Sequence, residues 1–313
     1  MNSIGGYFEL ELPRHSEYHR DALSLNTGRN CLEYILRVRG YKRVYLPYYS
    51  CEVLLEPFNK LDVDYVFYHI NECLELEEDI RLQDDEALLC INYFGIKQEY
   101  VETLAEKYRT QLIVDNTQAF YALPVQGIDT FYSCRKFFGV PDGAYLYCDK
   151  PLEMELEQDK SWERMRHLLK RIDVSAESAY ADFKACSAEL RNKPIRKMSH
   201  LTHRIMASID YQQPALRRYD NYRLLDSALK DKNGISLPWT SDAVPMVYPF
   251  LTEDETLRKR LIDNKIFVAQ YWPNVLDRCH EGSKEHQLAK YLLPLPIDQR
   301  YGSREMQFII NRI

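Results

Sequence analysis

The sequence lacks the features that are typical of membrane, secreted and nucleic-acid-binding proteins. No window approaches the roughly 20 apolar residues that a bilayer-spanning helix needs. Met1–Tyr7 contain no basic segment followed by an apolar run, so no signal peptide is expected. Lys and Arg total 41 against 47 Asp and Glu, a net charge of −6, whereas a nucleic-acid partner requires a concentrated basic face. We therefore expect a cytoplasmic protein whose partners include no membrane and no nucleic acid.

Paired cysteines and metal-ligand spacings are absent as well. None of the eight cysteines belongs to a C-x-x-C pair, and several lie inside apolar runs. Such cysteines are typical of reduced core thiols rather than of zinc ligands or disulfides. His200 and His203 are three residues apart, but no further ligand follows at a recognisable interval. We therefore expect no metal site.

One short basic cluster stands out in this mildly acidic chain. It comprises Arg191, Lys193, Arg196 and Lys197. A run of this length is most often a solvated helix face or loop. We therefore predict a solvent-exposed position for it.

The first half of the chain alternates apolar runs with amphipathic stretches. In Asn30–Arg39 and Glu99–Arg109 the apolar residues fall on one helical face. This alternation predicts an α/β fold with a mostly parallel sheet covered by helices on both faces. The runs that resemble strands are Val44–Pro47, Asp64–His69, Ala87–Asn92, Gln111–Asp115, Asp129–Ser133 and Ala144–Cys148.

The pattern divides the chain into three parts. Residues 1–150 form a large α/β domain, and the charged, helically periodic residues 151–235 form a helical segment. Residues 236–313 are predicted to form a small C-terminal α/β domain. Its expected strands are Met246–Phe250 and Ile266–Ala269, and its expected helices are Glu253–Asp263 and Glu305–Ile313.

Three features are expected at the edge of the sheet where the parallel strands end, which is where open α/β sheets bind ligands. The segment Asn26–Asn30 directly precedes a helix, so its free N–H groups suit a phosphate, although an ordinary helix cap would use the same residues. Asp115 ends an apolar strand, where a carboxylate keeps a cofactor ring nitrogen protonated or simply caps a turn. Lys136 follows the next strand as either a Schiff-base nucleophile or a surface lysine, and the Ser133 hydroxyl can donate to a phosphate.

With these features in this order, the sequence resembles the DegT/DnrJ/StrS-like sugar aminotransferases, which are pyridoxal 5'-phosphate (PLP) enzymes of fold type I. The resemblance extends from Ile4 to the C-terminus and is weakest across residues 151–233. The matching segments are Thr27-Gly28-Arg29, Leu46–Cys51, Asn92–Gly95, Asp115–Ala119, Ser133–Lys136, Trp272-Pro273 and Leu295–Tyr301.

The resemblance implies a role for each site residue. Lys136 would hold PLP as a Schiff base and act as the general acid and base, and Asp115 would pair with the ring nitrogen. Gln118 would lie near the phenolic oxygen of the ring. Cys51 occupies the position where members stack an aromatic residue on the cofactor, with Tyr49 or Tyr93 as substitutes. The phosphate would be surrounded by Thr27, Gly28, Arg29 and Ser133.

The resemblance also implies a function. Members move an amino group from glutamate or glutamine to a keto sugar, usually nucleotide-linked, in sugar biosynthesis, and they usually work as homodimers. For this chain we expect the acceptor to be such a keto sugar or a similar small carbonyl compound. One alternative retains PLP but dehydrates a sugar; Lys136 opposes it, because some dehydratases of this group replace that lysine. The other is a non-catalytic homologue used for binding or assembly. The missing aromatic at Cys51 favours it, whereas Asp115, Ser133 and Lys136 oppose it.

Overall fold

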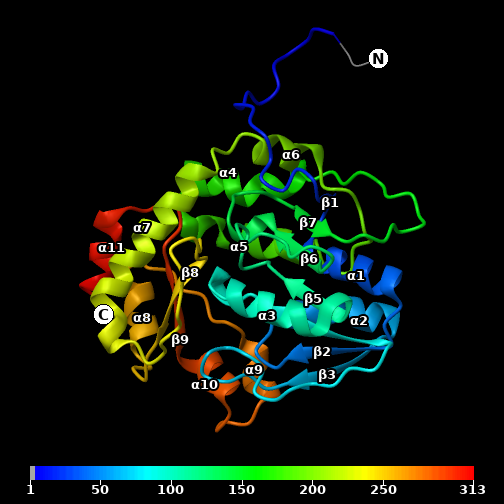
Figure 1. Ribbon diagram of the computed structural model, residues 1–313. Coiled ribbons are helices and arrows are strands. Elements are labelled where there is room, and N and C mark those ends of the chain that lie inside the picture. The colour runs from blue at the N-terminus through cyan, green and yellow to red at the C-terminus, as the bar shows by residue number, and fades with distance from the viewer. Residues whose placement is uncertain (1–3) are drawn as a thin grey trace.

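A seven-stranded sheet forms the centre of the molecule in the computed structural model, which describes residues 4–313 (Figure 1). The strand order is β1-β7-β6-β5-β4-β2-β3. Strands β2 to β6 run parallel to one another, and β7 is antiparallel to both of its neighbours, β6 and β1. The predicted mostly parallel α/β sheet is therefore confirmed. Its strands are β1 (Leu23–Leu25), β2 (Arg43–Pro47), β3 (Asp64–Tyr68), β4 (Glu86–Ile91), β5 (Leu112–Asp115), β6 (Asp129–Ser133) and β7 (Ala144–Tyr147).

Helices lie on both sides of this sheet in Figure 1, and the segment from 166 to 229 is rich in them. The helix α1 (Gly28–Arg39) is capped at its start by Thr27, whose side chain accepts a hydrogen bond from the Asn30 N–H. Gly40 caps its end with a left-handed φ of 70°. Within residues 4–313 the other helices are α2 (Glu56–Leu61), α3 (Gln98–Tyr108), α4 (Arg166–Asp173), α5 (Ala176–Ala188), α6 (His200–Met206), α7 (Gln212–Leu229), α8 (Leu257–Asp263), α9 (Pro273–Arg278), α10 (Lys284–Tyr291) and α11 (Ser303–Ile310). None of these helices is long and apolar enough to cross a bilayer.

A second, two-stranded sheet pairs β8 (Val247–Leu251) with β9 (Leu292–Pro296) in antiparallel register. The prediction of a strand at Ile266–Ala269 is wrong, because this stretch has no regular structure. Its alternation has another cause: Ile266 and Val268 are buried in the small core beneath β8, while Phe267 is 48% exposed. Burial of alternate side chains therefore arises there without any strand pairing.

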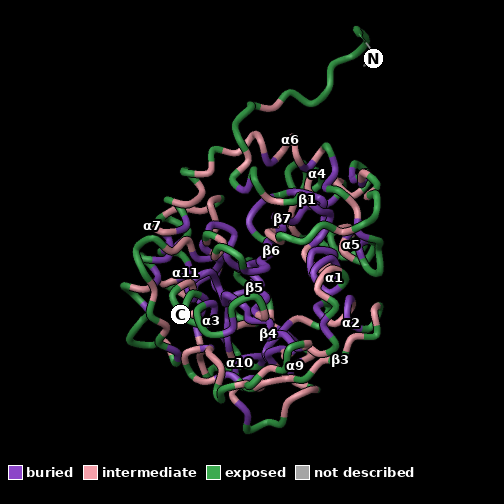
Figure 2. The backbone as a smooth tube through the Cα atoms, turned by 45° about the vertical axis from the view of Figure 1, so that its right-hand side comes forward, coloured by how far each residue is buried: buried purple, intermediate pink, exposed green. Residues whose placement is uncertain are grey.

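The strands of the large sheet differ from the N-terminal arm in burial (Figure 2). Every residue of β4 and of β5 is buried, as expected for strands covered on both faces. Residues 4–11 of the arm are exposed, and they extend away from the body of the molecule. The candidate site thus lies at the ends of the buried strands.

Gly95 fixes the turn after β4 and allows a close backbone approach beneath the site. Its φ is +76°, and an added Cβ would lie 2.9 Å from the Gln118 carbonyl oxygen and 3.1 Å from that of Val244. Both neighbours are backbone atoms, so neither can move aside cheaply. Gly40 has a similar φ of +70° but has open space around it.

We therefore expect Gly95→Ala to lower the free energy of unfolding by about 3 kcal/mol, the sum of left-handed strain and overpacking. Gly40→Ala should lose only about 1 kcal/mol, because it carries the strain alone. Urea unfolding of both variants gives the comparison. If both variants lose the same free energy of unfolding, the close backbone approach at Gly95 does not contribute to the cost of the substitution.

Candidate functional site

The three predicted features meet at one edge of the large sheet. Asp115 ends β5, Ser133 ends the neighbouring parallel strand β6, and Lys136 closes the short 3-10 helix η4 (Cys134–Lys136) that follows. β1 runs in the same direction, so the loop after it opens at the same edge. The loop is close to β5 and β6: a Cβ on Gly28 would lie 3.2 Å from Thr117 Cγ2 and 3.6 Å from Phe131 Cδ2.

Asp115 is a buried carboxylate without a cationic partner. It is 6% exposed, and it forms no ion pair within 4.0 Å among residues 4–313. Burial raises its pKa, while hydrogen bonds from Thr117, including the N–H at 2.8 Å, and the positive charge of Lys136 lower it. A protonated ring nitrogen would supply the missing partner, so the residues present fit a PLP ring.

Lys136 is exposed and faces an aromatic side chain from the other end of the chain. Its Nζ lies 5.9 Å from the centroid of the Tyr271 ring. Tyr271 precedes α9, and its ring is nearly parallel to those of Phe94 and Trp272, with interplanar angles of 15° and 21°. Burial raises the Tyr271 pKa to about 12, and the nearby positive charge of Arg218 opposes this.

The sequence does not single out Tyr271. It suggests Tyr49 or Tyr93 as the aromatic residue that stacks on the cofactor, because Cys51 occupies the usual position of that residue. Tyr49 and Tyr93 are 0% and 2% exposed, and the Tyr93 hydroxyl donates to the Tyr49 carbonyl oxygen at 2.7 Å. Both rings therefore belong to the core. Cys51 is half-buried before η1 (Glu52–Leu55), close enough to Tyr271 to influence its pKa. The Trp272-Pro273 segment, which matches the family, is the sequence signal adjacent to Tyr271. It does not indicate that Tyr271 faces Lys136 in the folded chain.

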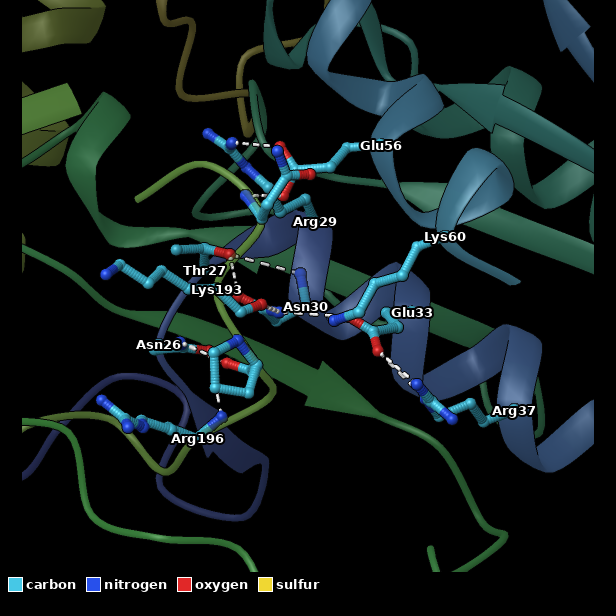
Figure 3. A network of polar contacts seen from close by, with 12 residues as sticks. Asn26, Thr27, Arg29, Asn30, Glu33, Arg37, Glu56, Lys60, Lys193 and Arg196 are labelled. Carbon is cyan, nitrogen blue, oxygen red and sulfur yellow. Dashed lines mark hydrogen bonds and ion pairs between the residues drawn. The ribbon is translucent and has the colours of Figure 1, made fainter. Parts of the chain in front are cut away.

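The start of α1 combines a capped side chain, shown with its neighbours in Figure 3, with two backbone donors. The Thr27 side chain is occupied by Asn30, since its hydroxyl donates to Asn30 Oδ1 at 2.6 Å and accepts from the Asn30 N–H at 3.2 Å. The N–H groups of Gly28 and Arg29 have no acceptor among residues 4–313. With the Ser133 hydroxyl, likewise without a partner in that part of the chain, they can bind a phosphate.

Two predicted side chains are engaged elsewhere. The Arg29 guanidinium pairs with Glu56 at 2.7 Å, and both side chains are mostly buried. Gln118 Oε1 accepts from the Phe94 N–H at 2.8 Å, which fixes the turn at η2 (Tyr93–Gly95). A direct role for either side chain at a cofactor remains a prediction, and each would first have to release or share its present partner.

A buried arginine connects the lysine turn to the C-terminal part of the chain. Arg218 is 2% exposed, and its guanidinium carbon lies 4.5 Å from the ring centroid of Phe137, the residue after Lys136. Its Nε donates to Gln299 Oε1 at 3.0 Å, and Gln299 Nε2 donates to the Phe137 carbonyl oxygen at 2.8 Å. Burial lowers the Arg218 pKa to about 10, so the group stays charged at pH 7. These contacts hold the backbone beside Lys136.

Comparison with solved structures identifies the fold. The DegT DnrJ EryC1 StrS aminotransferase from Brucella abortus matches with a TM-score of 0.62 at 15% identity, over 93% of this chain and 84% of its own. NtdA from Bacillus subtilis with bound cofactor PMP matches with a TM-score of 0.61 at 14% identity, over 93% and 72%. A variant of GDP-4-keto-6-deoxymannose-3-dehydratase (ColD) with bound GDP-perosamine matches with a TM-score of 0.63 at 13% identity, over 93% and 87%.

Neither a scan of protein-family models nor a search of curated proteins found a match. At the identities of the structural matches, the likeness establishes the fold alone. The fold predicted from the sequence is thereby confirmed: the chain has the fold of sugar aminotransferases of the DegT/DnrJ/StrS type. What this fold does in the present chain follows from its site residues.

Proposed function

We propose that this protein is a PLP-dependent aminotransferase that moves an amino group from glutamate or glutamine to a keto sugar, usually nucleotide-linked. The observation that carries the proposal is that Asp115 and Lys136 lie at the same edge of the sheet without forming an ion pair. The first is a buried carboxylate without an ion pair in residues 4–313, and the second is an amine close enough to lower its pKa. A protein without PLP would gain nothing from an unpaired buried carboxylate at this position.

The described residues would supply partners for the ring nitrogen, the phosphate and the aldehyde of the cofactor. Asp115 would hold the ring nitrogen protonated, and the N–H groups of Gly28 and Arg29 together with the Ser133 hydroxyl would hold the phosphate. Lys136 would bind the aldehyde carbon. Gly28 has no Cβ, which leaves room beside Thr117 and Phe131 for the phosphate to reach the Gly28 N–H.

PLP, when bound, withdraws electrons from the substrate carbon that loses its proton. The Lys136 amine accepts that proton and returns it, as a general base and then a general acid. Its position on η4 is fixed through Phe137 by Gln299 and Arg218. The Tyr271 ring faces Lys136, with the amine 5.9 Å from its centroid, and would bound that side of the site.

The test is a pair of half-reactions. The protein with bound PLP should absorb near ~420 nm, as a PLP–lysine Schiff base does, and glutamate should bleach this band while 2-oxoglutarate forms. A nucleotide-linked 4-keto-6-deoxy sugar should then restore the band and yield an amino sugar. If PLP gives no band, the proposal fails. A band with loss of water from the sugar and no amino product would instead support the dehydratase, which the ColD match keeps in view.

Tyr271 gives a further prediction about cofactor binding. Tyr271→Leu removes the aromatic face beside Lys136, so we expect the Kd for PLP to rise about tenfold, which corresponds to about 1.4 kcal/mol. Tyr271→Phe keeps the ring and should stay within about twofold of wild type, because a stacking contact needs no hydroxyl. Quenching of intrinsic fluorescence by added PLP measures both. A Tyr271→Leu variant that binds PLP as wild type does would remove Tyr271 from the site.

We also propose that the protein acts in the cytoplasm as a homodimer. All eight cysteines are free thiols, which suits a reducing compartment. The side chain of Lys136 is exposed, which leaves space for a partner subunit over the site. Sedimentation of the protein with bound PLP measures the assembly, and a monomer that is fully active would contradict it.

A further inference from the structure

A cavity of about 280 Å³ lies beside the loop between β1 and α1. This volume equals that of roughly nine water molecules in the liquid, enough for a phosphate group and part of what carries it. Four cations and two carboxylates line it, a formal charge of +2 (4 − 2). We call it the basic cavity, and its charged residues are Lys160, Arg164, Lys193, Arg196, Glu157 and Asp159.

The two carboxylates of the basic cavity are already paired. Asp159 binds Arg164 at 2.7 Å and lies 3.8 Å from Arg196, and Glu157 binds Arg196 at 3.0 Å. Lys160 and Lys193 have no carboxylate within 4.0 Å in the part of the chain that the structure describes. Two positive charges therefore face the cavity without a counter-charge from residues 4–313.

Two guanidinium groups on the cavity wall suit an oxyanion better than a simple charged surface does. Arg164 and Arg196 both line the cavity, and their side chains are 11% and 35% exposed. A phosphate group offers several acceptor oxygens in a geometry that guanidinium groups match well.

The basic cavity is held rigidly against the start of α1. The Asn26 N–H donates to the Arg196 carbonyl oxygen at 3.0 Å, and the Arg196 N–H donates to Asn26 Oδ1 at 3.3 Å. Asn30 Nδ2 donates to the Lys193 carbonyl oxygen at 3.0 Å. Figure 3 shows the side chains of Lys193 and Arg196 extending past the start of the helix. The backbone that carries Lys193 and Arg196 is therefore fixed to the start of α1.

We propose that the basic cavity binds a phosphate group, either as the free ion or as part of a phosphorylated sugar. This site is separate from the one proposed for PLP, since Asp115, Ser133 and Lys136 do not line it. The predicted solvent exposure of the basic cluster is confirmed for Arg191, Lys193 and Lys197, while Arg196 is half-buried. Lys193 and Arg196 line the cavity from this cluster. Lys197 of the same cluster does not line it and is exposed.

Calorimetric titration with inorganic phosphate tests the proposal. The protein is first loaded with PLP and reduced with borohydride, so that the cofactor fills its own phosphate position. The double variant Lys160→Gln/Lys193→Gln should bind phosphate at least about tenfold more weakly, because two charge-assisted contacts are lost. Lys197→Gln removes one positive charge four residues from Lys193 but outside the cavity, and it should stay within about twofold of wild type.

Each outcome decides a separate point. Absence of phosphate binding by wild type, or equal binding by the double variant, would overturn the proposal and leave a cavity that holds only water. Equal affinity for phosphate and glucose 1-phosphate would identify a free-ion site, whereas tighter binding of the ester would identify a phosphorylated sugar. If the protein takes up no PLP, the proposed function fails, but titration of the untreated chain still tests the cavity through the same variants.

Discussion

Replacing Lys136 with alanine is expected to abolish the absorption near ~420 nm and to lower the rate of transamination by roughly 10⁴-fold. The side chain has two roles that no neighbour can take over, because it both holds the cofactor aldehyde and moves the proton. Borohydride reduction followed by mass spectrometry should show covalent PLP on wild type and none on Lys136→Ala. Lys197→Ala, a change at another exposed lysine, should keep both the band and the label.

A rival lysine follows β4 at the same edge of the sheet. Lys97 is 5% exposed, and its Nζ lies 2.5 Å from Glu75. A buried amine that is held by a carboxylate is not free to attack an aldehyde. Covalent PLP that persists in Lys136→Ala and disappears in Lys97→Ala would therefore contradict the assignment of Lys136.

The long apolar strands could be predicted from the sequence because burial on both faces leaves a clear pattern. β4 and β5 are examples, and their predicted bounds are right to within one residue. β9 could not be predicted, since Pro294 and Pro296 within Leu292–Pro296 argue against a strand. It is tolerated because the sheet has only two strands, so each strand has a free edge.

The site residues divide in the same way. Asp115, Ser133 and Lys136 could be predicted because each follows a recognisable strand, and the order of strands brings their ends together. The contacts of Tyr271 with Lys136 and of Arg29 with Glu56 could not be predicted, because each depends on the packing of distant segments. Local pattern thus identifies which residues reach the sheet edge, and tertiary packing decides which of them are free to act.

Asp115→Asn is expected to stabilise the folded protein in the absence of PLP. The same substitution is expected to weaken PLP binding and to slow transamination. Burial raises the pKa of Asp115 in the folded state above its usual value of 3.8. Its stabilising contribution is therefore complete below about pH 3.8 and is lost as the pH rises through the folded-state pKa. At pH 7 the carboxylate opposes folding, and an amide of the same shape removes that penalty, so the free energy of unfolding should rise by about 1 kcal/mol.

Asp129 provides the matched control on the neighbouring strand. It is 2% exposed, but Arg39 binds both of its carboxylate oxygens at 2.7 Å. Asp129→Asn breaks this buried pair, so we expect a loss of about 3 kcal/mol. Urea unfolding of both variants without PLP measures the contrast. If Asp115→Asn destabilises the protein, then Asp115 already has a stabilising partner within the chain and needs no cofactor to compensate its charge.

Binding of PLP should reverse the sign of the Asp115→Asn effect. The ring nitrogen pairs with the wild-type carboxylate, whereas an amide cannot hold that nitrogen protonated. The Kd for PLP should rise at least about tenfold, and transamination should fall by roughly 10²- to 10³-fold, as for the loss of one preorganised electrostatic contact. Asp129→Asn should leave PLP affinity unchanged at temperatures where it is folded, because Asp129 begins β6 at the opposite edge of the sheet. A carboxylate that costs stability in the free protein and restores it with the cofactor is selected for binding rather than for folding.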